Sequence, residues 1–288
     1  MAKDTLFYQK HFINCSGRLL DLSSPKVMGI LNITDDSFFD GGRYNDGRKM
    51  LQHAEEMIKA GADIIDVGGQ STRPGSKRID AETESAKVIP ALRELKKHFG
   101  EMIFSVDTYH SSVAEQAVAE GASIVNDISG GTIDIKMFDT ISRLNVPYVL
   151  MHMQRTPETM QKSPSYTNVT DELMNFFSEN ISTLHQLGVH DIIIDPGFGF
   201  GKTLEHNYTL LKNLSLFRML GLPILCGLSR KSMVGKLLNV SPEDSLNGTT
   251  ALNAIALMKG ANILRVHDVK EAMEVIKIVT SLQINSPN

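Results

Sequence analysis

The chain has 288 residues, of which 42% are hydrophobic and 22% are charged, and its formal net charge at pH 7 is −4. This composition is typical of a globular protein and excludes a disordered chain, a collagen and a disulfide-rich mini-protein. The charges are interspersed, without the basic stripe of a nucleic-acid-binding protein. No apolar stretch approaches the roughly 18 residues of a membrane span, the first residues do not resemble a secretion signal, and Cys15 and Cys226 form no disulfide framework. We therefore expect a cytoplasmic protein with no nucleic-acid or membrane partner.

The chain repeats one local pattern, in which a helical stretch ends at glycine and a short β-branched run follows. The pattern is clear at residues 60–65, 120–125 and 259–264, and a looser copy occupies residues 187–194. Glycine just after a helix supplies the left-handed residue that ends it, and the run that follows is typical of a buried strand. The repeat therefore predicts a chain that alternates helices and strands.

Eight nearly continuous apolar runs are candidate strands: residues 27–31, 63–67, 102–106, 123–128, 146–151, 191–195, 223–228 and 262–266. Such runs suit parallel strands that are covered on both faces. Together they predict the α/β fold class and a (β/α)8 TIM barrel. A doubly wound open sheet is the alternative, but it usually has a glycine-rich turn after its first strand, and residues 31–34 do not form one.

Residues 26–288 are expected to form this barrel as a single domain, because no linker divides them. Residues 1–25 are an N-terminal extension that could form a hairpin capping the barrel bottom. Between residues 46 and 60, apolar residues fall on one face of a predicted helix. Another helix is expected to begin near Ser241, because serine can cap a helix and Pro242 suits its first turn.

Polar side chains collect at the C-terminal ends of the predicted strands. They are Asn32, Asp66, Asp107, Asn126, Asp127, His152, Asp195, Ser229, Arg230, Lys231, Arg265 and His267. In a barrel these ends meet on the face where such enzymes carry out their chemistry. Any one of them could simply cap a helix, but burying a whole set without use is costly, so the set indicates a binding site.

The set divides by charge. Asp107, Asn126 and Asp195 are acceptors that suit a ligand rich in N–H donors, such as an aminopyrimidine ring. Three cationic residues, Lys231, Arg265 and His267, follow the last two strands, where barrels of this type often bind phosphate. The simpler alternatives are a solvated surface charge for Lys231 and an ion pair with Asp268 for Arg265.

Two loops on the same face, at residues 34–45 and 70–77, have the glycine content of lids that close over a substrate, although they could equally be surface loops. The segment 195–203 ends in Gly-Lys-Thr but is not a P-loop, because Pro196 stands where that motif requires glycine. Its alternating glycines are expected to let the backbone approach a flat ligand, with Phe200 as a wall. Asn32, together with acids of the first loop, could bind Mg²⁺, whereas His152 has no second histidine at zinc-ligand spacing.

Eight motifs in order resemble the bacterial dihydropteroate synthase family, over residues 18 to 280. They are residues 29–34, 66–75, 105–108, 126–128, 150–153, 195–202, 229–232 and 265–268. The resemblance implies a single-domain (β/α)8 barrel, a homodimer and a target of sulfonamide inhibitors. It also implies a transferase of folate biosynthesis, in which p-aminobenzoate displaces pyrophosphate from 6-hydroxymethyl-7,8-dihydropterin pyrophosphate to give 7,8-dihydropteroate.

The resemblance also assigns roles to residues. It implies a pterin site at Asp107, Asn126, Met151, Asp195 and Lys231, and a pyrophosphate and Mg²⁺ site at Asn32, Arg73, Arg265 and His267, with Asn32 as the metal ligand. It implies a p-aminobenzoate site at Phe38, Thr72, Pro74, Phe200 and Ser232. The catalytic residues are then Lys231, Asp195, Arg265 and Asp40, of which Asp40 helps to stabilise a pterin cation formed by early departure of pyrophosphate.

The sequence departs from the family pattern at Asp35, Phe39 and Gln70, where proline, serine and glutamate are usual. These changes bear on the geometry of the first loop, on metal affinity and on drug sensitivity. Two alternatives remain, a pterin-binding methyltransferase and a pterin-binding barrel without catalysis. The residues at 71–74 and the three cations argue against the first, and the complete set of acids and bases argues against the second. A phosphosugar lyase would need a lysine inside a strand, and no candidate strand contains one.

Overall fold

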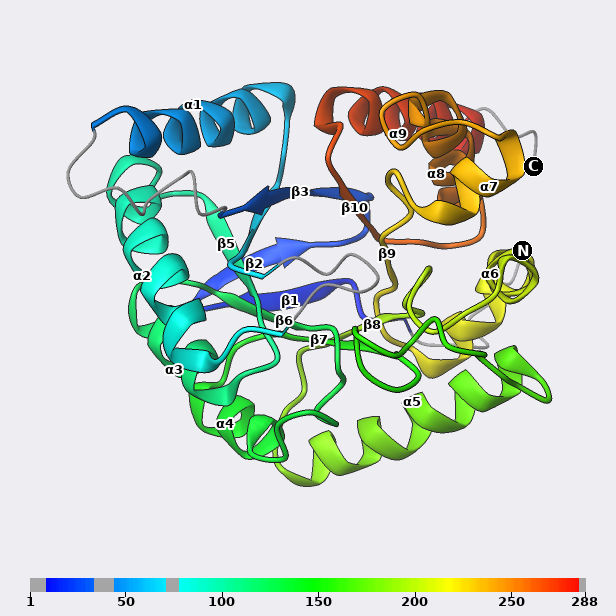
Figure 1. Ribbon diagram of the computed structural model, residues 1–288, viewed down its shortest axis with the longest axis horizontal. Coiled ribbons are helices and arrows are strands. Elements are labelled where there is room, and N and C mark those ends of the chain that lie inside the picture. The colour runs from blue at the N-terminus through cyan, green and yellow to red at the C-terminus, as the bar shows by residue number, and fades with distance from the viewer. Residues whose placement is uncertain (1–8, 34–43, 71–77, 285–288) are drawn as a thin grey trace.

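The computed structural model describes residues 9–33, 44–70 and 78–284. Within these ranges, eight parallel strands lie around a common axis and helices cover them on the outside (Figure 1). The strands are β3 (Lys26–Asn32), β4 (Ile64–Gly68), β5 (Ile103–Asp107), β6 (Ile124–Asp127), β7 (Tyr148–Met151), β8 (Ile192–Asp195), β9 (Leu225–Cys226) and β10 (Ile263–Val266). Their order is β8-β7-β6-β5-β4-β3-β10-β9, and a parallel bridge between Ile194 and Ile224 joins the two ends. The predicted (β/α)8 barrel is confirmed.

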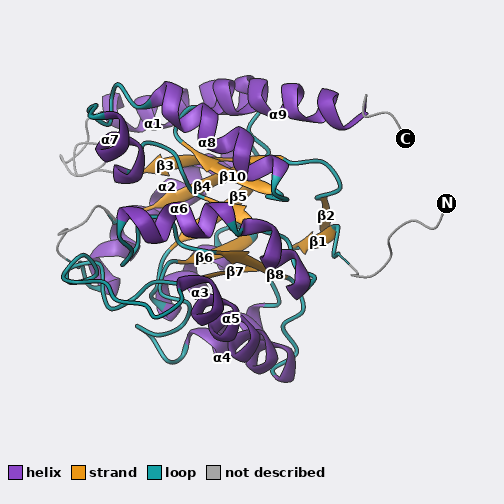
Figure 2. Cartoon of the chain, turned by 90° about the vertical axis from the view of Figure 1, so that its right-hand side faces the viewer, coloured by secondary structure: helices purple, strands orange, loops and turns teal. Residues whose placement is uncertain are grey.

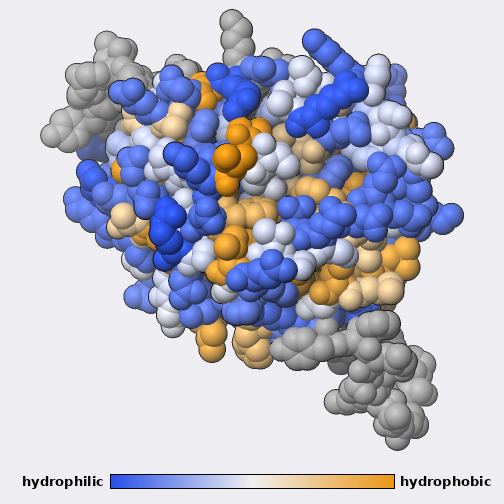
Figure 3. Space-filling model, turned by 90° about the horizontal axis from the view of Figure 1, so that it is seen from below, coloured by the Kyte–Doolittle hydropathy of each residue, from blue (hydrophilic) through white to orange (hydrophobic). Residues whose placement is uncertain are grey.

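The helices that surround the barrel are α1 (Tyr44–Ala60), α2 (Ala81–His98), α3 (Ser111–Ala119), α4 (Met137–Leu144), α5 (Val169–Gln186), α6 (Leu204–Lys212), the 3-10 helix η2 (Leu214–Leu220), α7 (Ser232–Leu238), α8 (Leu246–Met258) and α9 (Val269–Ile284). The predicted apolar face of α1 is confirmed, because Met50, Ala54 and Met57 are buried. None of the described helices has the length and apolar character of a membrane span. The face that carries α5 is mainly hydrophilic, with small apolar groups scattered over it (Figure 3).

The helix expected to begin near Ser241 starts later. Ser241 Oγ accepts a hydrogen bond from the Asp244 backbone N–H at 3.3 Å, and the Ser245 hydroxyl donates to the Pro242 carbonyl at 2.7 Å. These bonds close a turn, so α8 begins only at Leu246. The prediction was wrong because a serine followed by an acid stabilises an isolated turn as well as a helix start.

An antiparallel hairpin of β1 (Phe12–Cys15) and β2 (Arg18–Asp21) lies at the N-terminal end of the barrel strands (Figure 2). It packs Ile13, Cys15 and Leu20, together with Leu22, against a ring of buried side chains, one from each strand. The ring consists of Met28, Ile64, Ile103, Ile124, Val149, Ile193, Leu225 and Ile263. This apolar ring and the hairpin close the bottom of the barrel.

Side chains on a strand alternate between its two faces, so the next inward position on each strand lies two residues further along. These positions hold Ile30, Asp66, Ser105, Asn126, Met151, Asp195, Gly227 and Arg265. In the strand register, Ile30 pairs with Asp66, Asp66 with Ser105, and Met151 with Asp195. Elsewhere the strands are staggered by two residues, since Ser105 pairs with Ile124 and Arg265 with Met28. One step along the strands therefore converts an apolar ring into a polar ring.

Candidate active site

The polar ring is organised around the carboxylate of Asp66, which is fully buried on β4. Its Oδ2 accepts hydrogen bonds from Asn126 Nδ2 at 2.9 Å and from Arg265 Nε at 2.7 Å. One carboxylate on β4 thus holds side chains from β6 and β10. Because Asn126 points its N–H donor at Asp66, its carbonyl oxygen is the group left to accept from a ligand.

Arg265 also donates from Nη2 to Asp107 Oδ2 at 2.5 Å. Burial alone would lower the pKa of Arg265, but Asp66 and Asp107 together raise it, so the guanidinium stays charged. The suggested pair between Arg265 and Asp268 is wrong. Arg265 lies among the carboxylates instead, so the acids and the cations are interleaved at the mouth.

Asp107 and Asp195 are both buried carboxylates at the ends of their strands. Burial raises the pKa of Asp107, and Arg265 opposes this rise. Burial also raises the pKa of Asp195, opposed by the Gly197 N–H, which donates to Asp195 Oδ1 at 2.7 Å, and by the charges of Lys231 and Arg265. These mutual effects place the two acids and the two cations in one cluster, as the sequence predicted.

The Lys231 ammonium lies 4.1 Å from the centre of the Phe200 ring, so it makes a cation–π contact. Burial, and then the charge of Arg265, lower the pKa of Lys231 to about 8, while Asp195 and Asp107 oppose the change. Lys231 is therefore part of the cluster and not the solvated surface charge that was the alternative. Phe200 itself is buried beneath it.

Two contacts join the loops that follow β9 and β10. The Ser229 hydroxyl lies 3.0 Å from His267 Nδ1, and Arg230 binds both carboxylate oxygens of Asp268, at 2.7 and 3.0 Å. Arg230 has a left-handed backbone, with φ of +53°. These contacts fix the backbone just before Lys231 and just after Arg265.

His267 keeps an exposed edge, but partial burial of its ring and the nearby Arg265 lower its pKa to about 4. The charges of Arg230 and Lys231 act in the same direction, and Asp268 opposes them, so the protein without ligand favours the neutral ring at pH 7. A bound phosphate would favour the protonated ring.

An apolar cluster adjoins the polar residues of the mouth and includes Met151, an inward residue of β7 that was predicted to pack on the pterin ring. Its members are Tyr109, Ile128, Met151, Met153, Met160 and Phe200. Met160 belongs to the long connection between β7 and α5, and Gln161 beside it donates to the Gly199 carbonyl at 2.6 Å. The sequence predictions overlooked this connection as part of the site.

The glycines after β8 face protein rather than open space. A Cβ on Gly197 would lie 2.1 Å from the His152 carbonyl oxygen, and one on Gly201 would lie 2.7 Å from that of Gln154. Both glycines have positive φ angles. The expectation that they admit a flat ligand is wrong at these two positions, where they let this loop pack on the chain that follows β7.

Several predicted residues lie outside the described part of the chain: Phe38, Asp40, Thr72, Arg73 and Pro74, as well as Asp35 and Phe39 and most of the two proposed lids. Ser232 is exposed at the start of α7, directly after Lys231. Gln70 is described, and its side-chain oxygen accepts the Tyr109 hydroxyl at 2.6 Å. Its Nε2, the group that distinguishes it from the glutamate usual in the family, is buried without a hydrogen-bond partner among the described residues.

Asn32 is exposed at the end of β3, on the face that carries the cluster. Its amide oxygen is a ligand of the hard type that Mg²⁺ accepts. Within the described ranges, no group of three or more histidine, cysteine, aspartate or glutamate side chains could hold a metal ion. Asn32 therefore fits as one oxygen ligand of a Mg²⁺ ion that takes further ligands from phosphate and water.

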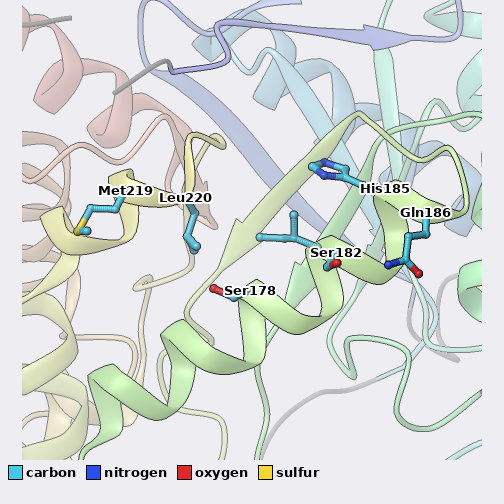
Figure 4. Close-up of a pocket in the computed structure, with 7 residues that line it drawn as sticks. Ser178, Ser182, His185, Gln186, Met219 and Leu220 are labelled. Carbon is cyan, nitrogen blue, oxygen red and sulfur yellow. The ribbon is translucent and has the colours of Figure 1, made fainter. Parts of the chain in front are cut away.

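A separate groove of about 600 Å³ lies between α5 and η2, lined by Ser178, Ile181, Ser182, His185, Gln186, Met219 and Leu220 (Figure 4). Helices of this fold run back along the strands, so the end of α5 that lines the groove lies at the bottom of the barrel. The groove holds none of the carboxylates or cations of the polar ring.

Comparison with known proteins identifies the family. Residues 28–267 match the family model of pterin binding enzymes, so the chain belongs to that family of barrel enzymes. It is 47% identical to dihydropteroate synthase of Escherichia coli (strain K12) over 265 residues, which cover 91% of this chain and 93% of that protein. The predicted resemblance to dihydropteroate synthase is confirmed, and with it the prediction of a transferase in folate synthesis.

Solved structures agree with this assignment. Yersinia pestis dihydropteroate synthase in complex with a sulfonamide drug superimposes with a TM-score of 0.88 at 43% identity, covering 95% of this chain and 99% of that one. Xanthomonas albilineans dihydropteroate synthase with 4-aminobenzoic acid gives 0.87 at 37% identity, covering 97% and 100%. The shared fold thus extends over nearly the whole chain.

Two residues that pack beside this site, Lys202 and Met160, were given no role in it by the sequence. Asp66 was predicted to lie at the mouth, since it is a carboxylate inside an otherwise apolar strand, but its central position was not predicted. Lys202 was considered only as part of a failed P-loop. Met160 lies in a connection without any periodic pattern, so no local signal marks it as buried.

Proposed function

We propose that this enzyme condenses 6-hydroxymethyl-7,8-dihydropterin pyrophosphate with p-aminobenzoate and releases 7,8-dihydropteroate and pyrophosphate. The observation that carries the proposal is the charged cluster in the barrel mouth, where Asn126, Asp195 and Arg265 of the polar ring lie with Asp107 and Lys231. The family match and the dihydropteroate synthase relatives support it.

The pterin site follows from the hydrogen-bonding capacity of this ring. Asn126 presents a carbonyl oxygen, and Asp195 presents a carboxylate that the Gly197 N–H fixes from the backbone side. Such acceptors suit the N–H groups of an aminopyrimidine ring. Within the described residues, Asp66 Oδ1 and Ser105 Oγ are also buried without a hydrogen-bond partner, as expected where a polar ligand or water completes the network. The side chain of Met151 supplies an apolar surface for the ring.

In the reaction, the bond from the pterin methylene carbon to pyrophosphate oxygen breaks, and a bond from that carbon to the amine nitrogen of p-aminobenzoate forms. The amine then loses a proton. An arylamine is a weak nucleophile, so early departure of pyrophosphate lowers the barrier by leaving a cation that the pterin delocalises. Asp107 and Asp195 stabilise this positive charge, while Lys231 and Arg265 stabilise the charge on the leaving group.

Pyrophosphate binding is assigned to Asn32, Arg265 and His267, with Arg73 from the loop outside the described residues. Asn32 would hold Mg²⁺, which supplies positive charge to the departing pyrophosphate when bound. His267 is neutral without ligand and takes up a proton more readily beside phosphate, so it can donate a second hydrogen bond there.

The p-aminobenzoate site is assigned to the outer edge of the mouth, at Phe200 and Ser232, with Phe38, Thr72 and Pro74 from the two loops. Asp40 is proposed to stabilise the pterin cation. The Yersinia pestis and Xanthomonas albilineans structures with a sulfonamide drug and 4-aminobenzoic acid support a site for p-aminobenzoate and for sulfonamide inhibitors.

We also propose a homodimer in the cytoplasm. Three large apolar side chains on the outer face of α8 and α9, Ile255, Met258 and Ile278, are 40%, 67% and 64% exposed. The two helices pack side by side (Figure 1), and the exposed apolar side chains that they carry are candidates for contacts with a second copy. Sedimentation equilibrium measures the oligomeric state, and a monomer at micromolar concentration would contradict the dimer.

The test of the reaction is a coupled pyrophosphate assay with Mg²⁺ and both substrates. Pyrophosphate release should depend on p-aminobenzoate, and a sulfonamide should reduce it in competition with p-aminobenzoate. Release that is independent of p-aminobenzoate, or none from folded protein, contradicts the proposal. A methyltransferase would instead transfer a methyl group from a methylated pterin without releasing pyrophosphate.

A further inference from the structure

Lys202 carries a buried ammonium group that the mechanism above does not use. The residue is only 3% exposed, although lysine is rarely buried without a specific set of partners. Its Nζ donates to the carbonyl oxygens of Gly197 at 3.0 Å, Phe200 at 3.0 Å and His152 at 3.1 Å, and lies 3.2 Å from His152 Nδ1. The ammonium thus forms hydrogen bonds with backbone carbonyl groups in two loops, the one that follows β8 and the one that follows β7.

The two segments joined by Lys202 follow neighbouring strands. His152 comes directly after β7, and Gly197 and Phe200 belong to the loop after β8. Burial and the charge of Lys202 lower the pKa of His152 to about 2, so its ring is neutral and its Nδ1 can accept from the ammonium. The Phe176 ring packs against His152 edge-on, with ring centres 4.9 Å apart. The ring is therefore held in place to receive the ammonium.

The loop that Lys202 fixes contains two residues of the proposed site. Asp195 stands at its start, where its carboxylate accepts from the Gly197 N–H and its carbonyl accepts from the His152 N–H at 3.1 Å. Phe200 stands at its end, under the Lys231 ammonium. Movement of this loop away from β7 would therefore displace the Asp195 carboxylate and the Phe200 ring together.

We propose that Lys202 is a positioning residue, whose ammonium holds the loop of residues 195–201 against the end of β7 so that Asp195 and Phe200 keep the spacing that the pterin and p-aminobenzoate sites require. This inference rests on the proposed function for its effect on substrates, but not for its effect on the loop. The charge of Lys202 also favours the ionised form of Asp195.

The experiment compares wild type with Lys202→Met, which keeps the length of the side chain and removes the ammonium. Lys97→Met on the outer surface of α2 is the matched control. In protein without ligand, amide hydrogen exchange at Gly197 and Phe200 should be at least about tenfold faster in Lys202→Met, as expected for the loss of hydrogen bonds to a charged donor. Exchange at Val125 in β6 should be unchanged.

The kinetic readout separates positioning from general support of the fold. The KM for the pterin substrate should rise by about tenfold, and the KM for p-aminobenzoate should rise as well, in protein whose circular dichroism matches wild type. A role in stability alone would lower Tm and the active fraction and leave both KM values unchanged, and that result would overturn the proposal.

A second variant covers the case in which Lys202→Met does not fold. His152→Leu removes the ring acceptor and keeps the ammonium with its three carbonyl partners, so a smaller rise in exchange and in both KM values is expected. Unchanged exchange at Gly197 and Phe200 in the folded variant overturns the inference, whether or not the protein releases pyrophosphate. Loss of pyrophosphate release in wild type, by contrast, contradicts only the proposed function.

Discussion

The bottom and the mouth of the barrel use the same eight strands for opposite purposes. At the bottom, each strand turns one apolar side chain inward, and the hairpin of β1 and β2 covers the ring that they form. Two residues further along, the inward positions include Asp66, Asn126, Asp195 and Arg265. The bottom gains free energy by removing apolar surface from water. At the mouth, burial costs free energy, because it raises the pKa values of the carboxylates and so opposes their charged forms.

The contrast between the two rings shows that residues for stability and residues for activity lie two positions apart on one strand. β6 illustrates it, because Ile124 belongs to the apolar ring and Asn126 belongs to the polar ring. Substitution at the first position should act on folding, and substitution at the second should act on substrate binding. Mutations in the two rings therefore test whether the separation is real.

The largest effect is expected at the bottom ring. Ile124→Ala should lower the free energy of unfolding by about 2–5 kcal/mol, because Ile124 is fully buried and its truncation leaves a cavity. The KM values of the folded variant should stay at the wild-type level. Urea unfolding measures the first quantity and steady-state kinetics the second.

The control for this prediction is Ile135→Ala, at a position that is 88% exposed, and it should change the free energy of unfolding by less than about 0.5 kcal/mol. A change of several-fold in either KM for Ile124→Ala, with little loss of stability, would show that the two rings are not separate.

The next effect is expected in the polar ring. Asp195→Ala should weaken binding of the pterin substrate by about 1.5–3 kcal/mol, the usual contribution of a charged hydrogen bond. Because burial raises the pKa of Asp195, removing its carboxylate should leave stability at pH 7 unchanged or slightly higher. Isothermal titration calorimetry measures the binding and thermal unfolding measures the stability.

Asp139→Ala, at an exposed position of α4, is the comparison variant and should bind the pterin substrate like wild type. Wild-type affinity in Asp195→Ala would place the pterin elsewhere in the molecule. A collapse of Tm in Asp195→Ala would mean that this carboxylate serves the fold in the way that the bottom ring does.

The barrel could be predicted from the sequence because its signals are local. Continuous apolar runs and glycines at helix ends are readable one segment at a time, and the polar residues follow from where those runs stop. Strand lengths were less predictable, since β9 has only two residues where a run of six was expected. The run includes Gly227, which has no side chain to pack. On the side of β8, a single bridge from Ile224 to Ile194 completes the barrel.

The site could be located from the sequence, but its internal partners could not. Arg265 pairs with Asp66 and Asp107, which are 199 and 158 positions away, so the neighbouring Asp268 was a misleading candidate. Asp268 instead binds Arg230, on the adjacent loop. Which acid pairs with which arginine depends on how the strands close into a barrel. The contacts of Gly197 with His152 and of Gly201 with Gln154 depend on the same closure.

The smallest of the three effects concerns the charge balance of the mouth. Burial lowers the pKa of Lys231 to about 8, so its ammonium is present below this pH and is lost as the pH rises through it. If that charge stabilises the leaving group, kcat/KM should fall about tenfold between pH 7 and pH 9, since the protonated fraction of such a group falls by that factor. The profile of kcat/KM against pH measures this.

Lys231→Arg sharpens the test, because a guanidinium stays charged throughout this range. Its activity at pH 7 should be lower than that of wild type, since arginine does not fit the contact over Phe200 in the same way. The part of the decline centred near pH 8 should disappear, and only the part that Lys202 contributes near pH 7 should remain. The pKa of the nearby Lys202 is lowered to about 7 by burial, so Lys202→Met is the necessary comparison and should keep the alkaline decline. If the decline persists in Lys231→Arg and vanishes in Lys202→Met, the titrating group is Lys202 and not Lys231. Activity at the mouth would then depend on the ammonium that positions the loop of Asp195 more than on the ammonium beside the substrate.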